Sequence, residues 1–243
     1  MKVSSILVAL ATYNEKENLP SLVAAIHAEL PQADLLVVDD NSPDGTGLWC
    51  DEFARQAPWF SCHHRSGKLG LGSALRAAMQ AANEQNYQSL ITLDADWSHP
   101  PSVLPQLVEA SKNADIVIGS RYCSGGRIEG WPWRRKLASR SINFSTRFLL
   151  GIPVQDCSGN FRLYRTKLLK QVPWHTLQDE GYAFIEEILY HLHSLGGCFA
   201  EVPIVFTDRR AGESKISSRE IFGAARTLVR LTAKRVKRLG SRV

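Results

Sequence analysis

The stretch Ser89-Leu90-Ile91-Thr92-Leu93-Asp94-Ala95-Asp96 joins an apolar run to two carboxylates that lie one residue apart. A short apolar run of this kind predicts a buried strand. In open α/β sheets, ligands bind outside the carboxyl ends of the strands. Asp94 and Asp96 would then hold a hard divalent cation at a rigid edge of the sheet. Because Asp-x-Asp is common by accident, the alternative is a surface turn with two solvated carboxylates.

Strand-like and helix-like segments alternate along the first half of the chain. We expect strands at residues 6–11, 35–38, 89–94 and 115–119, and helices at residues 17–30, 46–57, 71–83 and 101–112. In the second half we expect helices at residues 134–150 and 184–195, a polar segment at 156–162, a strand at 200–206 and a basic C-terminal helix. The alternation favours an α/β fold, with a mostly parallel central sheet covered by helices on both faces. No Pro/Ser-rich linker divides the 243 residues, so we expect a single domain.

The composition is ordinary for a globular protein, but the positive charge is unevenly distributed. The formal net charge is +5, and its excess lies in two basic regions, residues 134–147 and 219–242. Such regions suit phosphates, nucleic acid or acidic lipid. Because apolar side chains stand among the cations, both regions also suit a membrane surface; the alternative is that these apolar residues face the core. No run reaches the roughly 18–20 apolar residues of a membrane span, and we recognise no secretory signal.

The five cysteines are Cys50, Cys62, Cys123, Cys157 and Cys198, and none forms a CxxC pair. Their number is odd. We therefore expect reduced, buried thiols, as is usual for a cytoplasmic protein.

Polar clusters follow three of the predicted strands, at residues 12–15 (Thr-Tyr-Asn-Glu), 39–45 (Asp-Asp-Asn-Ser-Pro-Asp-Gly) and 94–96. Each cluster alone could be a helix cap or a turn. All three at one edge of a parallel sheet would suit a nucleotide. An aromatic ring would pack on the base, carboxylates would bind the base or the ribose, and the last pair would hold a metal on the phosphates.

Seven motifs in a fixed order resemble those of the inverting glycosyltransferases of family 2, which have a GT-A fold. Within that family they resemble the dolichol- or polyprenol-phosphate mannosyltransferases. The motifs are residues 11–15 (ATYNE), 38–45 (VDDNSPDG), 68–72 (KLGLG), 94–100 (DADWSHP), 119–122 (GSRY), 156–164 (DCSGNFRLY) and 208–215 (DRRAGESK). The resemblance covers roughly residues 5–220; each motif alone is weak, whereas the ordered set is specific.

The resemblance implies that the first two motifs bind the guanine nucleotide of GDP-mannose. The matching residues are Ala11, Tyr13, Glu15, Val38 and Asp40. Ala11 stands where the family usually has Pro, which keeps a backbone contact but loosens the turn.

The resemblance also implies that Asp94, Ala95 and Asp96 bind Mg²⁺ or Mn²⁺ together with the diphosphate of the donor. Ser98, where the family often has Gln, would be a shorter third metal ligand, and a water could intervene.

Further cations of the motifs match residues that neutralise the phosphates of donor or acceptor. They are Arg121, Arg209 and Lys215. Arg135 and Ser139 are four residues apart on a predicted helix and so share a face; they match the pair that receives the lipid phosphate. The residues expected to act directly in catalysis are Asp96, Arg121, Arg135 and Ser139.

Within the single domain 1–243, the resemblance assigns residues 1–122 to the nucleotide sugar, 123–215 to the acceptor and 216–243 to a basic amphipathic helix. The implied acceptor is dolichyl or polyprenyl phosphate. The implied location is the cytoplasmic face of a membrane, as a peripheral protein with or without a small membrane-anchoring partner. A phosphate acceptor is already an anion at neutral pH, so transfer needs alignment and charge compensation rather than a strong base. Direct displacement would invert the anomeric centre and give a β-linked product.

Two alternatives stay open. The donor could be UDP-glucose or another sugar nucleotide, because base choice depends on the backbone near Glu15 and Asp40. A different class is a non-catalytic nucleotide-binding scaffold at a membrane, against which the complete set of metal-site carboxylates and phosphate-binding cations argues. We expect no nucleic-acid binding, because the chain lacks a platform of interleaved aromatic and basic residues and its sheet edge is acidic.

Overall fold

A seven-stranded sheet with the strand order β3-β2-β1-β4-β7-β5-β8 forms the centre of the computed structural model, which describes residues 5–208 and 218–240. Its strands are β1 (Ile6–Thr12), β2 (Asp34–Asp39), β3 (Phe60–His64), β4 (Ser89–Asp94), β5 (Ile116–Ser120), β7 (Arg162–Arg165) and β8 (Phe199–Pro203). A separate pair consists of β6 (Arg127–Glu129) and β9 (Val205–Thr207). Every neighbouring pair of the large sheet is parallel except the two pairs that β7 makes, with β4 and with β5. The expected mostly parallel sheet is therefore confirmed.

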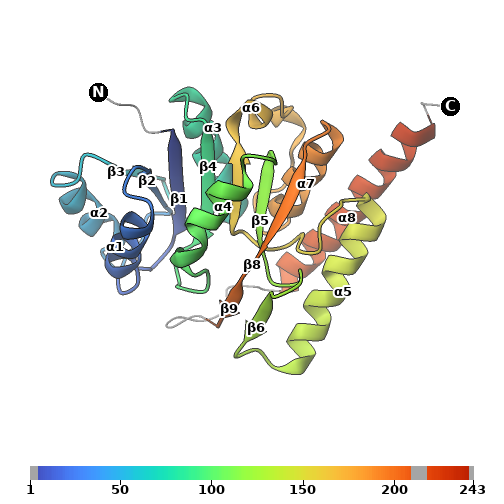
Figure 1. Ribbon diagram of the computed structural model, residues 1–243, viewed down its shortest axis with the longest axis horizontal. Coiled ribbons are helices and arrows are strands. Elements are labelled where there is room, and N and C mark those ends of the chain that lie inside the picture. The colour runs from blue at the N-terminus through green and yellow to red at the C-terminus, as the bar shows by residue number, and fades with distance from the viewer. Residues whose placement is uncertain (1–4, 209–217, 241–243) are drawn as a thin grey trace.

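Helices cover both faces of this sheet (Figure 1). They are α1 (Leu19–Glu29), α2 (Thr46–Ala54), α3 (Leu71–Glu84), α4 (Leu104–Ala110), α5 (Trp133–Leu150), α6 (Thr166–Leu169), α7 (Phe184–Ser194) and α8 (Ser218–Gly240), with short 3₁₀ turns at Pro101–Val103 and Trp174–Thr176. Alternate residues of a strand point to opposite faces. Leu7 and Ala9 of β1 accordingly pack in one apolar cluster with α3, α6 and α7, while Val8 and Leu10 pack in the other with α1, α2 and α4.

Sequence patterns missed or misplaced several short elements. β7 was not expected, and the polar segment predicted at 156–162 overlaps it only at Arg162. Arg162 is fully buried, and its guanidinium donates to the carbonyl oxygens of Cys157 and Ile185. The strand expected at 200–206 is divided into β8 and β9. The helix expected at 101–112 ends at Ala110. β3 and β6 were not expected, since neither carries a continuous apolar run.

α8 is attached to the domain by apolar packing, by ion pairs and by hydrogen bonds. Leu231 is fully buried in the same cluster as α3 and α7. Arg230 donates to Asp179 at 2.5 Å and to Glu187 at 2.7 Å. Farther along, Arg235 donates to the carbonyl oxygen of Leu149, at the end of α5, at 2.8 Å. α5 and α8 therefore lie side by side at one end of the molecule (Figure 1).

Apart from Leu150, the large apolar residues of α5 do not face the core. The buried residues of this helix are Asn143, Thr146 and Leu150. Exposed large apolar side chains occupy its outer surface, namely Trp133, Leu137, Ile142, Phe144, Phe148 and Leu149. Of the two expectations for this basic helix, the structure thus supports the exposed apolar face. Among the residues that the structure describes, none of the helices combines the length and apolar content that a bilayer crossing requires.

The first turn of α3 approaches another segment so closely that it leaves no room for a side chain. A β-carbon at Gly72 would lie 2.4 Å from the β-carbon of Phe184 and 2.6 Å from the carbonyl oxygen of Gly181. Gly70 has a φ of +95°, which favours glycine. The loop before α3 is therefore fixed against the loop before α7.

Gly72→Ala is expected to lower the free energy of unfolding by about 1–3 kcal/mol, because the added methyl group overpacks this contact. The matched control is Gly223→Ala, in α8, where a β-carbon meets nothing within 4 Å. The control should raise the free energy of unfolding by about 0.5–1 kcal/mol through helix propensity. Urea unfolding curves measure both values, and equal shifts for the two variants would contradict the close approach.

Candidate active site

Three parallel strands bring the predicted polar clusters to one edge of the sheet. β1 pairs with β2 so that Thr12 lies beside Asp39, and with β4 so that Ala11 lies beside Asp94. Strand ends that were separate in the sequence therefore meet at a common carboxyl edge, where α/β sheets bind ligands.

The first two clusters bind each other through Asp39, which is almost completely buried. Its carboxylate accepts hydrogen bonds from Thr12 Oγ1 at 3.0 Å and from Ser42 Oγ at 2.5 Å. Ser42 Oγ in turn accepts from the backbone N–H of Asn14 at 3.0 Å. The two loops are thus held in place by the protein itself.

The five residues expected to bind the nucleotide differ in how open they are. Tyr13 and Glu15 are partly exposed, and Lys68 Nζ lies 4.4 Å from the centre of the Tyr13 ring. Val38 is buried in the core, so only its backbone is available to a ligand. Ala11 is partly buried at the end of β1.

Asp40, the fifth of these residues, is already engaged by the protein. Its carboxylate accepts from Arg65 Nε at 2.5 Å and from the backbone N–H groups of Leu69 and Gly70 at 3.0 and 3.3 Å. Its most direct role is therefore to join the end of β2 to the loop before α3.

The carboxylates expected to bind metal stand on a turn with an unusual backbone. Trp97, between Asp96 and Ser98, has a φ of +66°, a conformation that bulky residues rarely adopt and that clusters at functional sites. Asp94 Oδ1 accepts from Asn160 Nδ2 at 3.0 Å, and Asp96 Oδ1 accepts from the backbone N–H of Ser98 at 3.1 Å.

Two buried oxygens beside these carboxylates, Ser98 Oγ and Asn160 Oδ1, find no hydrogen-bond partner among the residues that the structure describes. Within residues 5–208 and 218–240, no group of three or more His, Cys, Asp or Glu side chains could hold a metal by itself. Two carboxylates with nearby neutral oxygens fit Mg²⁺ or Mn²⁺ when a substrate's phosphates supply the remaining ligands, which is how Mg²⁺ is usually bound.

His99 fixes the backbone of this turn rather than acting as a base. Its Nδ1 accepts from the backbone N–H of Asp94 at 3.1 Å, and its ring stacks on Phe161 with 5.2 Å between centroids. Complete burial lowers the pKa of His99, although Asp94 and Asp96 oppose that shift. The imidazole is therefore neutral at neutral pH.

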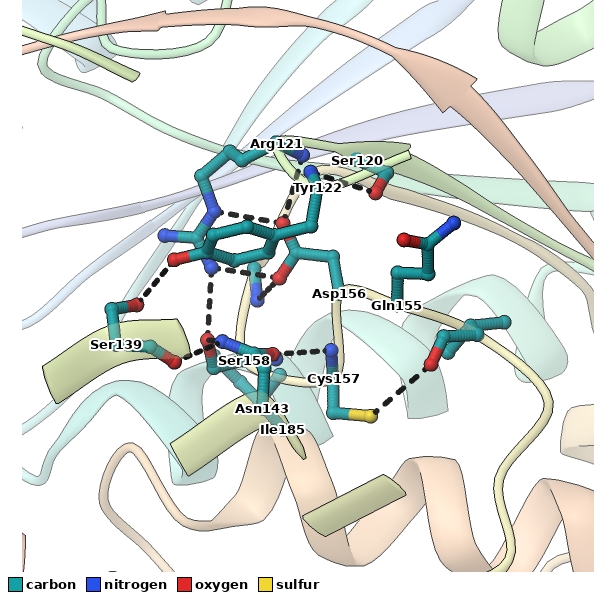
Figure 2. Close-up of polar contacts among 12 residues, drawn as sticks. Ser120, Arg121, Tyr122, Ser139, Asn143, Gln155, Asp156, Cys157, Ser158 and Ile185 are labelled. Carbon is teal, nitrogen blue, oxygen red and sulfur yellow. Dashed lines mark hydrogen bonds and ion pairs between the residues drawn. The ribbon is translucent and has the colours of Figure 1, made fainter. Parts of the chain in front are cut away.

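Arg121 and Asp156 form a buried, two-pronged ion pair (Figure 2). Arg121 donates to Asp156 through Nε and an Nη atom, both at 2.7 Å, and through its backbone N–H at 3.0 Å. Burial alone would raise the pKa of Asp156, but the charge and hydrogen bonds of Arg121 lower it. Arg121 also donates to Ser158 Oγ at 2.8 Å. Its charge, expected from the sequence to meet a phosphate, is thus largely balanced within the protein.

The structure brings the predicted acceptor residues to the same place. Tyr122 donates to Ser139 Oγ on α5 at 2.6 Å (Figure 2). Arg135, one turn earlier on that helix, lies 3.8 Å from the centre of the Trp131 ring, and Arg121 lies 5.9 Å from the same ring. Arg121, Arg135 and Ser139 therefore share one polar site. The other two predicted cations, Arg209 and Lys215, lie outside the described residues.

A model of the family described as glycosyl transferase family 2 matches residues 7–172. The chain belongs to this family. It is therefore a glycosyltransferase, as the motifs indicated.

Two curated relatives cover most of this glycosyltransferase. The polyprenol monophosphomannose synthase of Mycolicibacterium smegmatis is 42% identical over 217 residues, which are 88% of this chain and 82% of the relative. The undecaprenyl-phosphate mannosyltransferase of Micrococcus luteus is 40% identical over 212 residues, which are 87% of each protein.

Solved structures confirm the GT-A type of fold. Glucosyl-3-phosphoglycerate synthase from Mycobacterium tuberculosis, crystallised with Mn²⁺, UDP-glucose and phosphoglyceric acid, has a TM-score of 0.67 at 20% identity and covers 94% of this chain and 79% of its own. A structure described only as a mycobacterial protein has a TM-score of 0.70 at 20% identity, over 94% of this chain and 74% of its own.

Sequence reasoning assigned no role to several side chains that build this glycosyltransferase site. Asn160 contacts Asp94, Asp156 neutralises Arg121, and Trp131 lies between two guanidinium groups. Asn160 and Asp156 belong to a motif that the sequence singled out, but their partners are 66 and 35 residues away along the chain. No local pattern reports contacts over such separations.

Glu186, on α7, is a buried acid that the sequence did not single out. Burial raises its pKa to about 8, against the opposing charge of Arg162. The unfolded group titrates near its ordinary value of 4.5. Between these values the folded chain holds a proton that the unfolded chain has lost, so stability falls as the pH rises from about 4.5 to about 8.

Glu186→Gln is expected to remove this loss, because glutamine imitates the protonated acid. At about pH 8 the variant should exceed the wild type by on the order of 1–3 kcal/mol in free energy of unfolding, and near pH 5 the two should agree closely. Urea unfolding at both pH values measures the difference. Glu109→Gln, at a 71% exposed side chain, is the control and should change little at either pH. If the wild type instead became more stable relative to Glu186→Gln between pH 5 and pH 8, the raised pKa of Glu186 would be contradicted.

Proposed function

We propose that this glycosyltransferase transfers mannose from GDP-mannose to a polyprenyl or dolichyl phosphate, with inversion, at the cytoplasmic surface of a membrane. The observation that carries the proposal is the shared polar site of Arg121, Arg135 and Ser139 beside the metal carboxylates, in a chain 42% and 40% identical to two polyprenyl-phosphate mannosyltransferases. Asp94 and Arg121 are near enough to interact electrostatically.

The donor side of the reaction belongs to the carboxyl edge of β1, β2 and β4. Asp94 and Asp96 would hold the metal, with Ser98 and Asn160 as nearby neutral oxygens. A bound Mg²⁺ or Mn²⁺ would stabilise the charge that develops on the departing diphosphate. Asn160 orients Asp94 through its amide, and His99 fixes the backbone of the same residue.

The acceptor side belongs to α5. Arg135 and Ser139 would bind the lipid phosphate, and Tyr122 orients the Ser139 hydroxyl by donating to it. The phosphate arrives as an anion, so these residues need only place it behind the anomeric carbon. Attack from that side, opposite the diphosphate, gives the inverted β-linked product. No side chain has to remove a proton in this step.

Asp96→Ala is expected to lower kcat/KM by about 100-fold or more, since it removes stabilisation of the leaving diphosphate. The measurement is transfer of radiolabelled mannose from GDP-mannose to a short polyprenyl phosphate, with Mg²⁺ or Mn²⁺ and with neither. Glu109→Ala, at an exposed surface pair, serves as the control variant. Full metal-dependent transfer by Asp96→Ala would sink the metal assignment. UDP-glucose in parallel reactions tests the donor: a lipid product from UDP-glucose alone would overturn GDP-mannose and leave the glycosyltransferase assignment standing.

The exposed face of α5 supports the membrane location. Trp133, Phe144 and Phe148 are 69%, 68% and 72% exposed on the helix that carries Arg135 and Ser139. Aromatic side chains among cations are typical of helices that lie in a membrane interface. The proposed phosphate site would then bind the head group of the lipid acceptor. The exposed apolar face of α5 would contact the acyl chains of the same membrane leaflet.

The double variant Phe144→Ser/Phe148→Ser is expected to bind acidic liposomes at least about tenfold more weakly, because each buried aromatic side chain contributes about 1.5–3 kcal/mol. Cosedimentation with the liposomes measures binding. Leu48→Ser replaces an equally exposed apolar residue on α2, at 72% exposure, and should bind like the wild type. Equal losses in the two variants would argue against docking through α5.

A further inference from the structure

Two cysteines that are remote from the proposed catalytic residues meet at the other end of the sheet. Cys50 lies on α2 and is fully buried, whereas Cys62 lies on the edge strand β3 and is partly exposed. α2 packs beside β3 (Figure 1), and the Cys50 and Cys62 side chains of these two elements are near enough to interact, because Cys62 raises the pKa of Cys50. The expectation that the cysteines are buried is correct for Cys50 and Cys157 and wrong for the other three, because Cys62 and Cys123 are partly exposed and Cys198 is exposed. The sequence also gives no sign that residues 50 and 62 lie near each other.

A histidine and an aspartate stand in line with the more exposed thiol. His64 Nδ1 lies 4.0 Å from Cys62 Sγ, and His64 Nε2 lies 2.8 Å from Asp51 Oδ1. A carboxylate only accepts hydrogen bonds, so Nε2 carries the proton that Asp51 accepts. In the neutral imidazole, Nδ1 is then the acceptor and faces the Cys62 thiol. The arrangement is therefore a thiol nucleophile (Cys62), a base (His64) and a carboxylate that orients the base (Asp51), which is an arrangement that activates thiols.

The two thiols differ in exposure and in neighbours. The hydrogen bond to Cys62 raises the pKa of Cys50, with burial and the negative charges of Asp39 and Asp51 acting in the same direction. Cys50 therefore remains a thiol that donates to its neighbour. Cys62 is the accessible member and has both a donor, Cys50, and a base, His64, beside it. Reactive cysteines typically occupy partly exposed positions with such neighbours.

We propose that Cys62 is an oxidation site, activated by His64 and Asp51, and that its oxidised form is resolved by Cys50 into a disulfide. The oxidant is a hydroperoxide. The Cys62 thiolate attacks it, so that an S–O bond forms, the O–O bond breaks, and the leaving alkoxide or hydroxide takes the proton that His64 had received from the thiol. The Cys50 thiol then attacks the Cys62 sulfenic acid; the S–S bond forms, the S–O bond breaks and water leaves.

The site adjoins the loops that carry the proposed nucleotide contacts. A β-carbon at Gly47, in the first turn of α2, would lie 3.1 Å from His64 Cε1 and 3.3 Å from Asp39 Oδ2. Asp39 is the residue that binds Thr12 and Ser42 and so holds the two loops together. A covalent bond between α2 and β3 would act on this packing. The link to nucleotide binding rests on the proposed function, whereas the thiol chemistry does not.

The first test compares thiols in the wild-type chain, so that it does not depend on a variant that folds. Alkylation rates of each cysteine are measured with iodoacetamide and peptide mass spectrometry. Cys62 is expected to react at least about tenfold faster than Cys198, which is exposed and whose thiol donates to the carbonyl oxygen of Asn113. His64→Gln and Asp51→Asn should remove this advantage, and Cys198→Ser should leave it unchanged. A Cys62 that reacts no faster than Cys198 would overturn the proposal.

The second test follows oxidation by limiting hydrogen peroxide. A peptide cross-linked between Cys50 and Cys62, lighter by two hydrogens and released by dithiothreitol, is the expected product. In Cys50→Ser, oxidation should stop at a sulfenic acid that dimedone traps at Cys62. A disulfide between any other two cysteines would overturn the proposal. So would a chain purified with one equivalent of Zn²⁺ that protects both Cys50 and Cys62 from alkylation.

Calorimetric titration with GDP tests the link to the nucleotide site. Affinity is expected to fall severalfold on oxidation and to recover with dithiothreitol, while Cys62→Ser should be insensitive to peroxide. A cross-linked protein with unchanged GDP affinity would remove the link and keep the oxidation site. A reduced protein that binds no GDP would instead contradict the proposed function.

Discussion

The buried ion pair of Arg121 and Asp156 is the constraint on which the rest of the active site depends. Two charges removed from water require each other, and loss of one partner leaves the other uncompensated. Here the pair also joins segments that are distant in the sequence. The loop that follows Asp156 donates to and accepts from Asn143 of α5, and its Asn160 donates to Asp94, a proposed metal ligand. One interaction therefore helps to set the position of α5 relative to Asp94, and so of the proposed acceptor residues relative to the proposed metal carboxylates.

The acidic edge of the sheet divides into carboxylates that hold the protein together and carboxylates that we propose to bind metal. Asp39, Asp40 and Asp156 each accept several hydrogen bonds from the protein, and all three are buried. Asp94 keeps a side chain that is 35% exposed, and the buried hydroxyl of neighbouring Ser98 has no hydrogen-bond partner in the described part of the chain. Satisfied polar groups give rigidity, whereas incompletely satisfied ones mark the place where a ligand completes the network.

Local sequence patterns predicted the strands of the proposed donor side. They failed where a strand contains a polar side chain that is buried. β1, β2 and β4 are continuous apolar runs, so their positions could be predicted within one or two residues. The position of β7 could not be predicted, because Arg162 is a polar residue in the sequence. It can be buried only because carbonyl oxygens of the folded chain accept hydrogen bonds from its guanidinium. The site residues of α5 were placed correctly on one helix, but the direction of its apolar face depended on α8 and on the domain surface.

The sequence by itself determined the α/β class, the mostly parallel sheet, the order of the motifs and the family, because strand periodicity and short motifs are local properties of the chain. Tertiary structure alone decided which charges are free, which are paired, and which thiols meet. The engagement of Asp40 by Arg65, the neutralisation of Arg121 by Asp156 and the contact of Cys50 with Cys62 all join residues that are far apart or on different elements. The chemistry of a charged or nucleophilic group is set by its neighbours in space, and those neighbours exist only once the chain has folded.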